Sequence, residues 1–292
     1  MKYFQLLRTG HWVKNIFLLL PLFFAGDLFN SDKIIRIIWG FFLFSLAASS
    51  IYIINDYRDR DKDIQHPIKK FRPLAAGTVS PAFAVILSIA FIVIALIGSY
   101  FLEPHFHLII VAYYILNVAY SFGFKNIPIV DVFIIAVGFI LRVQAGAIVG
   151  EVPLSMWLNL MVFLLALFIA LGKRRDDVIL QSESGIEMRK SIDGYNMEFL
   201  NVTITMVCAI ILVCYLMYTI SPEVDARLRS SRLYYTSLFV FMGILRYLQL
   251  IFVKNDSGSP TKIIYKDRFL QITLILWILS FYFLIYVRDI TI

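Results

Sequence analysis

Long apolar runs alternate with short polar segments along almost the whole chain. A run of about 20 apolar residues is long enough for a helix to cross a bilayer, and a helix satisfies its own backbone hydrogen bonds there. The pattern therefore predicts an all-α, polytopic membrane bundle of about nine transmembrane helices. Their expected limits are Val13–Leu28, Ile34–Ile54, Ala82–Leu102, Phe106–Phe122, Ile127–Val149, Leu154–Leu171, Leu200–Ile220, Leu233–Val253 and Phe269–Val287.

Composition excludes an ordinary soluble protein. Of the 292 residues, 60% are hydrophobic and only 16% are charged, whereas soluble domains contain about 25% charged residues. The short loops favour one helical bundle, so we expect a single integral membrane domain over residues 1–292 and no nucleic-acid partner. Cys208 and Cys214 lie in one apolar run and are expected to be core residues rather than parts of a disulfide framework.

The distribution of Lys and Arg predicts the orientation. Most of the 27 basic residues fall in the N-terminus and in the loops after the second, fourth, sixth and eighth runs. Cytoplasmic loops carry the excess of basic residues, so this side is expected to face the cytoplasm, in a multi-pass protein of the cell inner membrane. Arg227, Arg229 and Arg232 form a local exception on the opposite side.

An acidic cluster directly follows the second apolar run. If the helix continues through it, Asp56, Asp59 and Asp63 lie at positions i, i+3 and i+7 and share one face. Asp61 points elsewhere. Like charges at this spacing repel one another, and carboxylate oxygens are ligands that suit Mg²⁺. The row therefore predicts a magnesium site, and a solvated loop with internal salt bridges is the structural alternative.

Other polar residues are expected to converge at the same membrane face. Asp131 and Arg142 share a face of the run Ile127–Val149, but about 16 Å along the helix axis separates them. Ionisable residues inside a span usually face the bundle interior, so both are candidate site residues. The alternatives are a helix N-terminal charge for Asp131 and a structural partner for Arg142. Further polar residues at this face are Lys14, Asn15, Tyr120, Ser121, Lys125, Lys266, Asp267 and Arg268.

The residues after the sixth apolar run form a mainly basic group. Lys173 and Asp177 lie four residues apart on one helical face. Arg174 and Arg175 lie beside them, and because Arg can hold phosphate through paired hydrogen bonds, the group predicts an anion clamp. Topology anchors are the alternative. Basic residues after the acidic cluster could extend the clamp, namely Lys69, Lys70 and Arg72. Gly146, within the small-residue run of residues 145–147, indicates close helix packing.

These motifs together resemble a known family. The chain matches the NDxxDxxxD motif of the UbiA superfamily of intramembrane prenyltransferases at Asn55, Asp56, Asp59 and Asp63, and Tyr120, Ser121 and Lys125 resemble its next turn. It is more closely similar to the decaprenyl-phosphate phosphoribosyltransferase subgroup over nearly its whole length. The residues that carry this closer resemblance are Trp12, Lys14, Asn15, His66, Pro67, Lys69, Arg72, Pro73, Gly138, Phe139, Leu141, Arg142, Ala145, Gly146, Lys173, Arg174, Arg246, Tyr247, Pro260, Asp267 and Arg268.

The resemblance implies a Mg²⁺-dependent membrane phosphoribosyltransferase. Its donor would be 5-phosphoribosyl 1-diphosphate (PRPP), its acceptor a polyprenyl (decaprenyl-type) phosphate, and its products polyprenyl-phosphoryl-5-phosphoribose, a cell-wall precursor, and diphosphate. Asp56, Asp59 and Asp63 would bind the metal and Asn55 would help orient its ligands. The substrate-binding residues implied are Lys14, Lys69, Arg72, Tyr120, Lys125, Asp131, Arg142, Lys173, Arg174 and Asp177.

Two other functions stay open. A prenyltransferase of aromatic or quinone pathways, which uses a prenyl diphosphate, would need a second acidic DxxxD row after the sixth run, where Lys173 to Asp177 stand instead. A transporter or membrane scaffold is the non-enzyme alternative. A transporter would more naturally show two related halves with broken helices near the bilayer midplane. The sequence leaves open the isoprenoid length and whether the chain forms a homo-oligomer.

Overall fold

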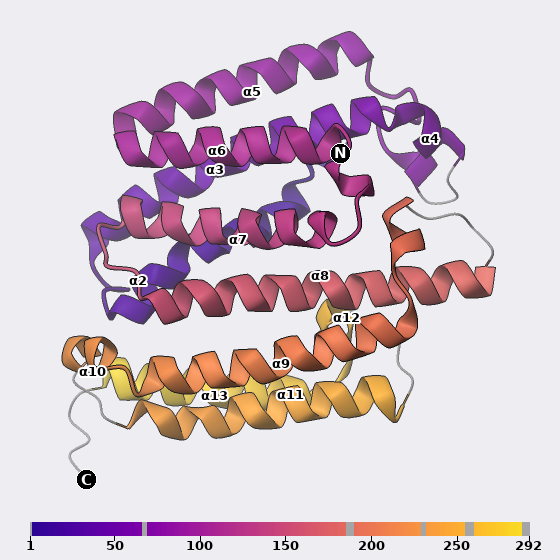
Figure 1. Ribbon diagram of the computed structural model, residues 1–292. Helices are drawn as coiled ribbons and strands as arrows, with labels where there is room; N and C mark the ends of the chain where they lie inside the picture. The colour runs from indigo at the N-terminus through magenta and orange to yellow at the C-terminus, as the bar shows by residue number, and fades with distance from the viewer. Residues whose placement is uncertain (1, 66–68, 185–189, 229–231, 255–259, 288–292) are drawn as a thin grey trace. The chain divides into compact units, whose positions relative to one another are not determined.

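The protein, seen in a computed structural model, is built from helices (Figure 1). The structure describes residues 2–65, 69–184, 190–228, 232–254 and 260–287, and this part contains no β-strand. The predicted all-α fold class is therefore confirmed. The α-helices are α1 (Lys2–Leu7), α2 (Leu20–Ala25), α3 (Ser31–Arg58), α4 (Arg60–Gln65), α5 (Pro81–Leu102), α6 (Pro104–Ser121), α7 (Val130–Val149), α8 (Met156–Ser184), α9 (Met197–Thr219), α10 (Pro222–Leu228), α11 (Ser237–Phe252), α12 (Pro260–Lys266) and α13 (Arg268–Tyr286). The 3-10 helices are η1 (Thr9–Leu19), η2 (Lys69–Phe71), η3 (Phe124–Asn126), η4 (Lys190–Gly194) and η5 (Leu233–Thr236).

Seven helices in the described part are long and apolar enough to cross a membrane. They support a multi-pass membrane protein, but the predicted count of about nine spans is not confirmed. Residues Val13–Leu28 fall in η1 and α2 instead of one long α-helix, and α2 ends at Gly26, whose φ of 81° lies in the left-handed region. The predicted fourth span is present as α6, but its 18 residues include His105, His107 and Asn117, which lower its hydropathy.

The chain divides into two compact units, each with its own internal contacts. Unit 1 contains Met1–Phe124 and Leu141–Pro153, and unit 2 contains Lys125–Ile140 and Leu154–Ile292. Helix α7 therefore supplies its first residues to unit 2 and its last residues to unit 1. The expectation of one domain over residues 1–292 stays a prediction.

Unit 1 is built around α3, which packs against α5, α6 and η1 (Figure 1). Gly146 of α7 lies so close to η1 that an added Cβ atom would be 1.9 Å from the carbonyl oxygen of Leu18. This contact confirms the close packing predicted from the small residues around Gly146. A cluster of buried apolar residues fixes the N-terminal helix against the last part of α3 and the start of α5; it contains Leu6, Ile53, Leu74, Val79 and Ala84.

Unit 2 pairs α8 with α9 and α11 with α13 (Figure 1). Its apolar core includes the rings of Phe168 and Tyr247, whose centroids are 4.7 Å apart. Cys208 and Cys214 of α9 are buried free thiols in this core, as predicted for them. Aliphatic and aromatic side chains of α8 and α9 thus bury their apolar faces against one another, which holds the basic end of α8 in place.

Local sequence sets where several helices begin. The side chains of Ser80, Asn196 and Asp267 each accept the backbone N–H of the residue three positions later. Such N-caps satisfy a donor that has no partner inside the helix. Pro81 follows Ser80 at the first position of α5, where its missing N–H costs nothing.

Candidate active site

The acidic row lies where α3 ends and α4 begins. Asp59 caps α3, yet helical spacing continues across it, because its N–H donates to the Asn55 carbonyl (2.9 Å) and the Asp63 N–H donates to the Asp59 carbonyl (2.8 Å). Asp56 and Asp63 consequently face the same side, and only 2% and 3% of their surfaces are exposed. Asp59 is half-buried, whereas Asp61 is exposed, as expected from its position off the row.

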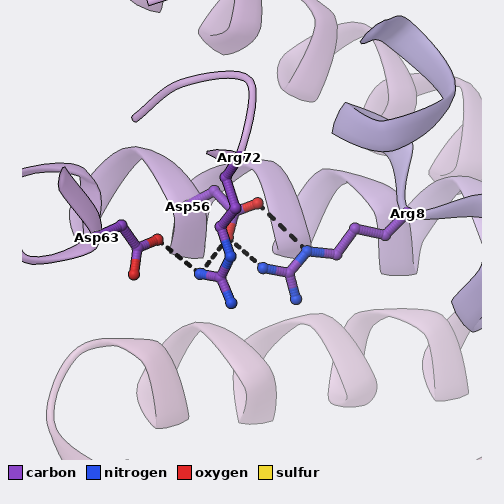
Figure 2. Close-up of polar contacts among 4 residues, drawn as sticks. All are labelled: Arg8, Asp56, Asp63 and Arg72. Carbon is purple, nitrogen blue, oxygen red and sulfur yellow. Dashed lines mark hydrogen bonds and ion pairs between the residues drawn. The ribbon is translucent and has the colours of Figure 1, made fainter. Parts of the chain in front are cut away.

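Two arginines bind the buried carboxylates (Figure 2). Arg8 donates from Nε to Asp56 Oδ2 (3.2 Å) and from Nη2 to Asp56 Oδ1. Arg72 Nη1 donates to Asp56 Oδ1 (3.1 Å) and to Asp63 Oδ2 (2.6 Å). Charged hydrogen bonds of this kind offset the cost of burying a carboxylate. The internal salt bridges that were the structural alternative for this cluster are thus present. Arg72, which the sequence predicted to bind phosphate, bonds to two carboxylates in this structure.

The chemistry of the row fits a divalent cation. One nitrogen of Arg72 lies within hydrogen-bonding distance of both Asp56 and Asp63, so the two carboxylates already share one cationic group. Mg²⁺ commonly binds through one or two carboxylates and completes its shell with water and phosphate oxygens. Among the described residues, no three His, Cys, Asp or Glu side chains are grouped closely enough to hold a metal. The residues of this row that would hold such a cation are therefore Asp56 and Asp63, the two carboxylates that Arg8 and Arg72 bond to in this structure.

A second polar group in unit 1 joins residues that the sequence placed in separate segments. Arg142 donates from Nε to Asn15 Oδ1 (2.8 Å) and from Nη2 to Tyr113 Oη (2.8 Å). Asn15 in turn donates from Nδ2 to Ser45 Oγ of α3 (2.8 Å). Arg142 is 5% exposed, whereas Lys14, the neighbour of Asn15, is exposed. The predicted site residues Lys14 and Arg142 are therefore brought into the same region of unit 1.

Asp131 is the centre of a buried network in unit 2. Its carboxylate accepts hydrogen bonds from Arg174 Nε (2.7 Å), Tyr195 Oη (2.7 Å) and Ser191 Oγ (3.1 Å). Arg174 also donates through Nη1 to Asp177 (2.6 Å), and its side chain is only 1% exposed. The structure thus brings together three predicted site residues, Asp131, Arg174 and Asp177, as an ion-paired group. Arg174 cannot contact a substrate in this arrangement, because its guanidinium is enclosed by protein.

Arg8, Ser191 and Tyr195 are residues that sequence reasoning did not single out. Tyr195 Oη accepts the Ile129 N–H (2.6 Å) while it donates to Asp131. Burial and the hydrogen bond to Asp131 raise the pKa of the Tyr195 phenol well above its ordinary value, so the group stays a proton donor. No local pattern marks these three residues, since their acidic partners lie 48, 60 and 64 positions away.

The remaining predicted residues lie near these groups or on the surface. Arg58, at the end of α3, donates from Nη1 to the Ser121 carbonyl (2.6 Å), which ties the turn after α6 to the acidic end of α3. Arg175 is buried and donates from Nε to Asn201 Oδ1 (2.9 Å), so it stabilises α8 against α9. Lys173 is exposed, and the half-buried predicted residues are Asn55, Lys69, Tyr120 and Lys125. His66 and Pro67 lie outside the described residues.

A sequence model of the UbiA prenyltransferase family matches residues 16–275 of this chain. The chain belongs to the UbiA prenyltransferase family. This membership confirms the resemblance inferred from the NDxxDxxxD motif at Asn55 to Asp63.

Relatives within this UbiA family include decaprenyl-phosphate phosphoribosyltransferases from several organisms. The protein of that name from Mycolicibacterium smegmatis is 34% identical over 283 residues, which cover 93% of this chain and 88% of that protein. The one from Corynebacterium glutamicum is 32% identical, with 96% of this chain and 86% of that protein covered. The similarity extends over nearly the full length of each chain.

Solved structures of UbiA proteins share the fold. A UbiA homolog from Archaeoglobus fulgidus, bound to DMAPP and Mg²⁺, superposes with a TM-score of 0.72 at 21% identity, covering 98% of this chain and all of that one. A digeranylgeranylglyceryl phosphate synthase superposes with a TM-score of 0.70 at 17% identity, covering 98% of both chains. At these identities the likeness establishes the fold alone.

Proposed function

We propose that this UbiA-family protein transfers the 5-phosphoribosyl group of PRPP to the phosphate of a polyprenyl phosphate. A phosphate oxygen of the lipid bonds to the anomeric carbon, with inversion. The bond from that carbon to the diphosphate breaks, and diphosphate leaves with the electron pair. The observation that carries the proposal is the 32–34% identity, over nearly the whole chain, to proteins named decaprenyl-phosphate phosphoribosyltransferase.

The carboxylates of unit 1 suit the leaving-group end of this donor. Asp56, Asp59 and Asp63 would hold Mg²⁺, with Asp59 at the junction between α3 and α4. The amide of Asn55 would help orient the ligands. When bound, the metal supplies positive charge that stabilises a departing diphosphate. Arg72, which bonds to both carboxylates, offers a planar cationic fork beside them that suits phosphate oxygens.

The nucleophile of the proposed reaction requires no strong general base. A phosphate monoester has a second pKa of about 6 and is largely dianionic near pH 7. The lipid phosphate can therefore attack without first losing a proton to the protein. We accordingly assign no residue as a base, and the task of the protein is to hold two anionic substrates together while neutralising their charge.

In unit 2, the surface cation Lys173 is the residue that we assign to a phosphate, because its side chain is exposed on α8. Lys125, half-buried in the turn before α7, is a second candidate. Arg174 receives a different role from the one expected from the sequence. Its buried guanidinium holds Asp131 and Asp177, so it positions the end of α8 instead of binding substrate directly.

The lipid substrate requires an apolar surface within the membrane. The most apolar stretch of α5 has a mean hydropathy of 2.7, yet only 22% of it is buried inside the protein, so much of this helix is open to lipid. We propose that the isoprenoid lies along such helix faces with its phosphate at the acidic end of α3. From the distribution of Lys and Arg we assign that end to the cytoplasmic face of the cell inner membrane.

Charge-neutral substitutions in the acidic row test the proposal. Asp56→Asn and Asp59→Asn should each abolish Mg²⁺-dependent turnover, because an amide removes the negative charge that holds the metal. Membranes would be incubated with Mg²⁺, a polyprenyl phosphate or an aromatic acceptor, and either PRPP or a prenyl diphosphate, and the lipid product would be identified by its mass. Asp61→Asn is the matched control, since Asp61 is exposed and lies off the row.

Two outcomes would contradict these assignments. Near-normal turnover of both row variants, at equal amounts of inserted protein, would remove the metal role from Asp56 and Asp59. Product formed by the wild type from prenyl diphosphate but not from PRPP would replace the proposed reaction with that of a prenyltransferase.

A further inference from the structure

A hollow of about 250 Å³ lies in unit 2, where the last turns of α8 meet the turn η4. Pockets for drug-sized ligands measure about 300–1,000 Å³, so this hollow suits a smaller molecule. Its lining residues are Val178, Gln181, Ser182, Ile192, Asp193 and Tyr195. All of them belong to unit 2, whereas the acidic row belongs to unit 1, so the hollow is lined by a different set of residues.

The wall that α8 supplies contains an acceptor without a partner. The amide oxygen Oε1 of Gln181 is buried and has no hydrogen-bond partner among the described residues. Nearly all buried polar groups have a partner, so a buried acceptor that lacks one points to a ligand that donates to it. Beside it, Ser182 Oγ donates its proton to the Ile179 carbonyl (2.7 Å), which leaves this hydroxyl with lone pairs alone to offer.

The opposite wall carries a carboxylate on a turn that is fixed on both sides. Asp193 lies between Ser191 and Tyr195, which donate to the same buried carboxylate at 3.1 and 2.7 Å. A Cβ atom added at Gly194 would lie 2.3 Å from Cγ of Pro128, so the turn also packs directly against that proline. Asp193 itself is exposed and has no hydrogen bond or ion pair with another described residue. Its position is thus set by neighbours that do not neutralise its charge.

Tyr195 adds an oxygen of the same kind. Its hydroxyl donates to Asp131 Oδ1 (2.7 Å) and accepts the Ile129 N–H (2.6 Å), so its only proton is already used. The side-chain oxygens of the lining, none of which has a free proton to donate, belong to Gln181, Ser182, Asp193 and Tyr195. A phosphate or carboxylate ligand would meet these acceptors and the negative charge of Asp193. The lining therefore favours a cation that carries N–H donors.

Apolar side chains complete the lining. Val178 is half-buried, and Ile192 is only 2% exposed. Their hydrocarbon surface suits methylene groups, which gain free energy when they leave water. A primary ammonium group has three donors and no acceptor, which matches the oxygens of the lining. A short alkyl chain that ends in an ammonium group satisfies both kinds of surface.

We propose that this hollow binds a small, soluble primary amine in its ammonium form. The N–H groups of the ligand donate to Gln181 Oε1 and to the Asp193 carboxylate, and its methylene groups lie against Val178 and Ile192. The site is additional to the proposed transfer reaction and does not depend on it.

The length of α8 favours a soluble amine over the head group of an ethanolamine lipid. The helix has 29 residues, or roughly 44 Å, whereas the hydrocarbon core of a bilayer is about 30 Å thick. The charged stretch of α8 begins at Lys173, and residues 178–182 lie roughly 8 to 14 Å further along the axis. The head-group layer on each side of the core is roughly 5 to 8 Å thick. The hollow therefore lies at or beyond the outer edge of that layer.

Three matched probes test the proposal on the full-length protein in phosphatidylcholine nanodiscs. Propylammonium has the chain, the charge and three N–H donors, tetramethylammonium has the charge but no N–H, and 1-propanol has the chain but no charge. Each is titrated by calorimetry, and the melting temperature is measured with and without it. Propylammonium should bind and raise the melting temperature, because a ligand that binds only the folded state stabilises it. The other two should bind at least about tenfold more weakly, because each lacks the charge-assisted N–H bonds.

Two substitutions in the lining separate binding from stability. Gln181→Leu should weaken propylammonium binding about tenfold, because a hydrogen bond to a charged group is lost. Without ligand this variant should be at least as stable as the wild type, since it removes a buried acceptor that has no partner. Asp193→Asn should weaken binding about threefold, because the charge of an exposed carboxylate is screened by solvent. Glu198→Gln, which removes an equally exposed charge from the same unit, is the matched control and should leave the affinity unchanged.

Four results would overturn the proposal. The first two are no measurable binding of propylammonium by the wild type and equal affinity for all three probes. The third is wild-type affinity in both Gln181→Leu and Asp193→Asn, or a loss in Glu198→Gln equal to that in Asp193→Asn. The fourth is a propylammonium affinity that falls when an ethanolamine lipid replaces part of the phosphatidylcholine, which would assign the hollow to a lipid head group instead of a soluble amine.

Discussion

Asp131→Asn is the substitution whose effect on stability the structure predicts most sharply. Asp131 is fully buried and forms an ion pair with Arg174, which is itself 1% exposed. The asparagine variant leaves a buried guanidinium with Asp177 as its remaining carboxylate in this network. Breaking a buried pair by removing one partner costs about 3–5 kcal/mol. The contact with the partly exposed Asp177 remains and offsets only part of this cost. Hydrogen bonds from Tyr195 and Ser191 also become weaker, since they lose a charged acceptor.

The measurement is the free energy of unfolding in mixed micelles. Asp177→Asn is the control, because Asp177 pairs with the same arginine but its side chain is 22% exposed, and it should cost about 1 kcal/mol or less. Adding Arg174→Met to Asp131→Asn should recover part of the loss, because the double variant removes both buried charges. The reasoning would be refuted if Asp131→Asn cost no more than Asp177→Asn, or if the double variant were less stable than the single one.

A further prediction concerns the packing of Gly146 in unit 1. Gly146→Ala should lower the free energy of unfolding by about 3 kcal/mol or more, because its Cβ would overlap the Leu18 carbonyl. Gly243→Ala is the control, since its Cβ would make only one ordinary contact, at 3.9 Å. This variant should be neutral or stabilising in the same unfolding measurement. Equal effects would contradict the packing argument.

Local patterns determined the membrane character and the acidic row of this protein. Apolar runs predict spanning helices because the length of a run can be compared directly with the thickness of the bilayer. This comparison does not depend on contacts with other parts of the chain. The row of Asp56 and Asp63 is predictable for a similar reason, since residues seven apart on a continuing helix share a face. For Val13–Leu28, apolar composition predicted a span, but the backbone forms η1 and α2 instead of one long α-helix, so this span stays a prediction.

The tertiary structure alone decided which charges meet. Arg8 bonds to Asp56, which lies 48 positions away in the sequence, and Arg142 bonds to Asn15, which lies 127 positions away. No helical period predicts contacts between residues so far apart in the sequence. The basic group at the end of α8 is the instructive case. Sequence spacing predicted that Arg174 would face a phosphate, but packing buries it against Asp131, 43 positions earlier. A charged side chain takes the partner that packing brings to it when it is removed from water, and the chain's periodicity carries no information about that partner.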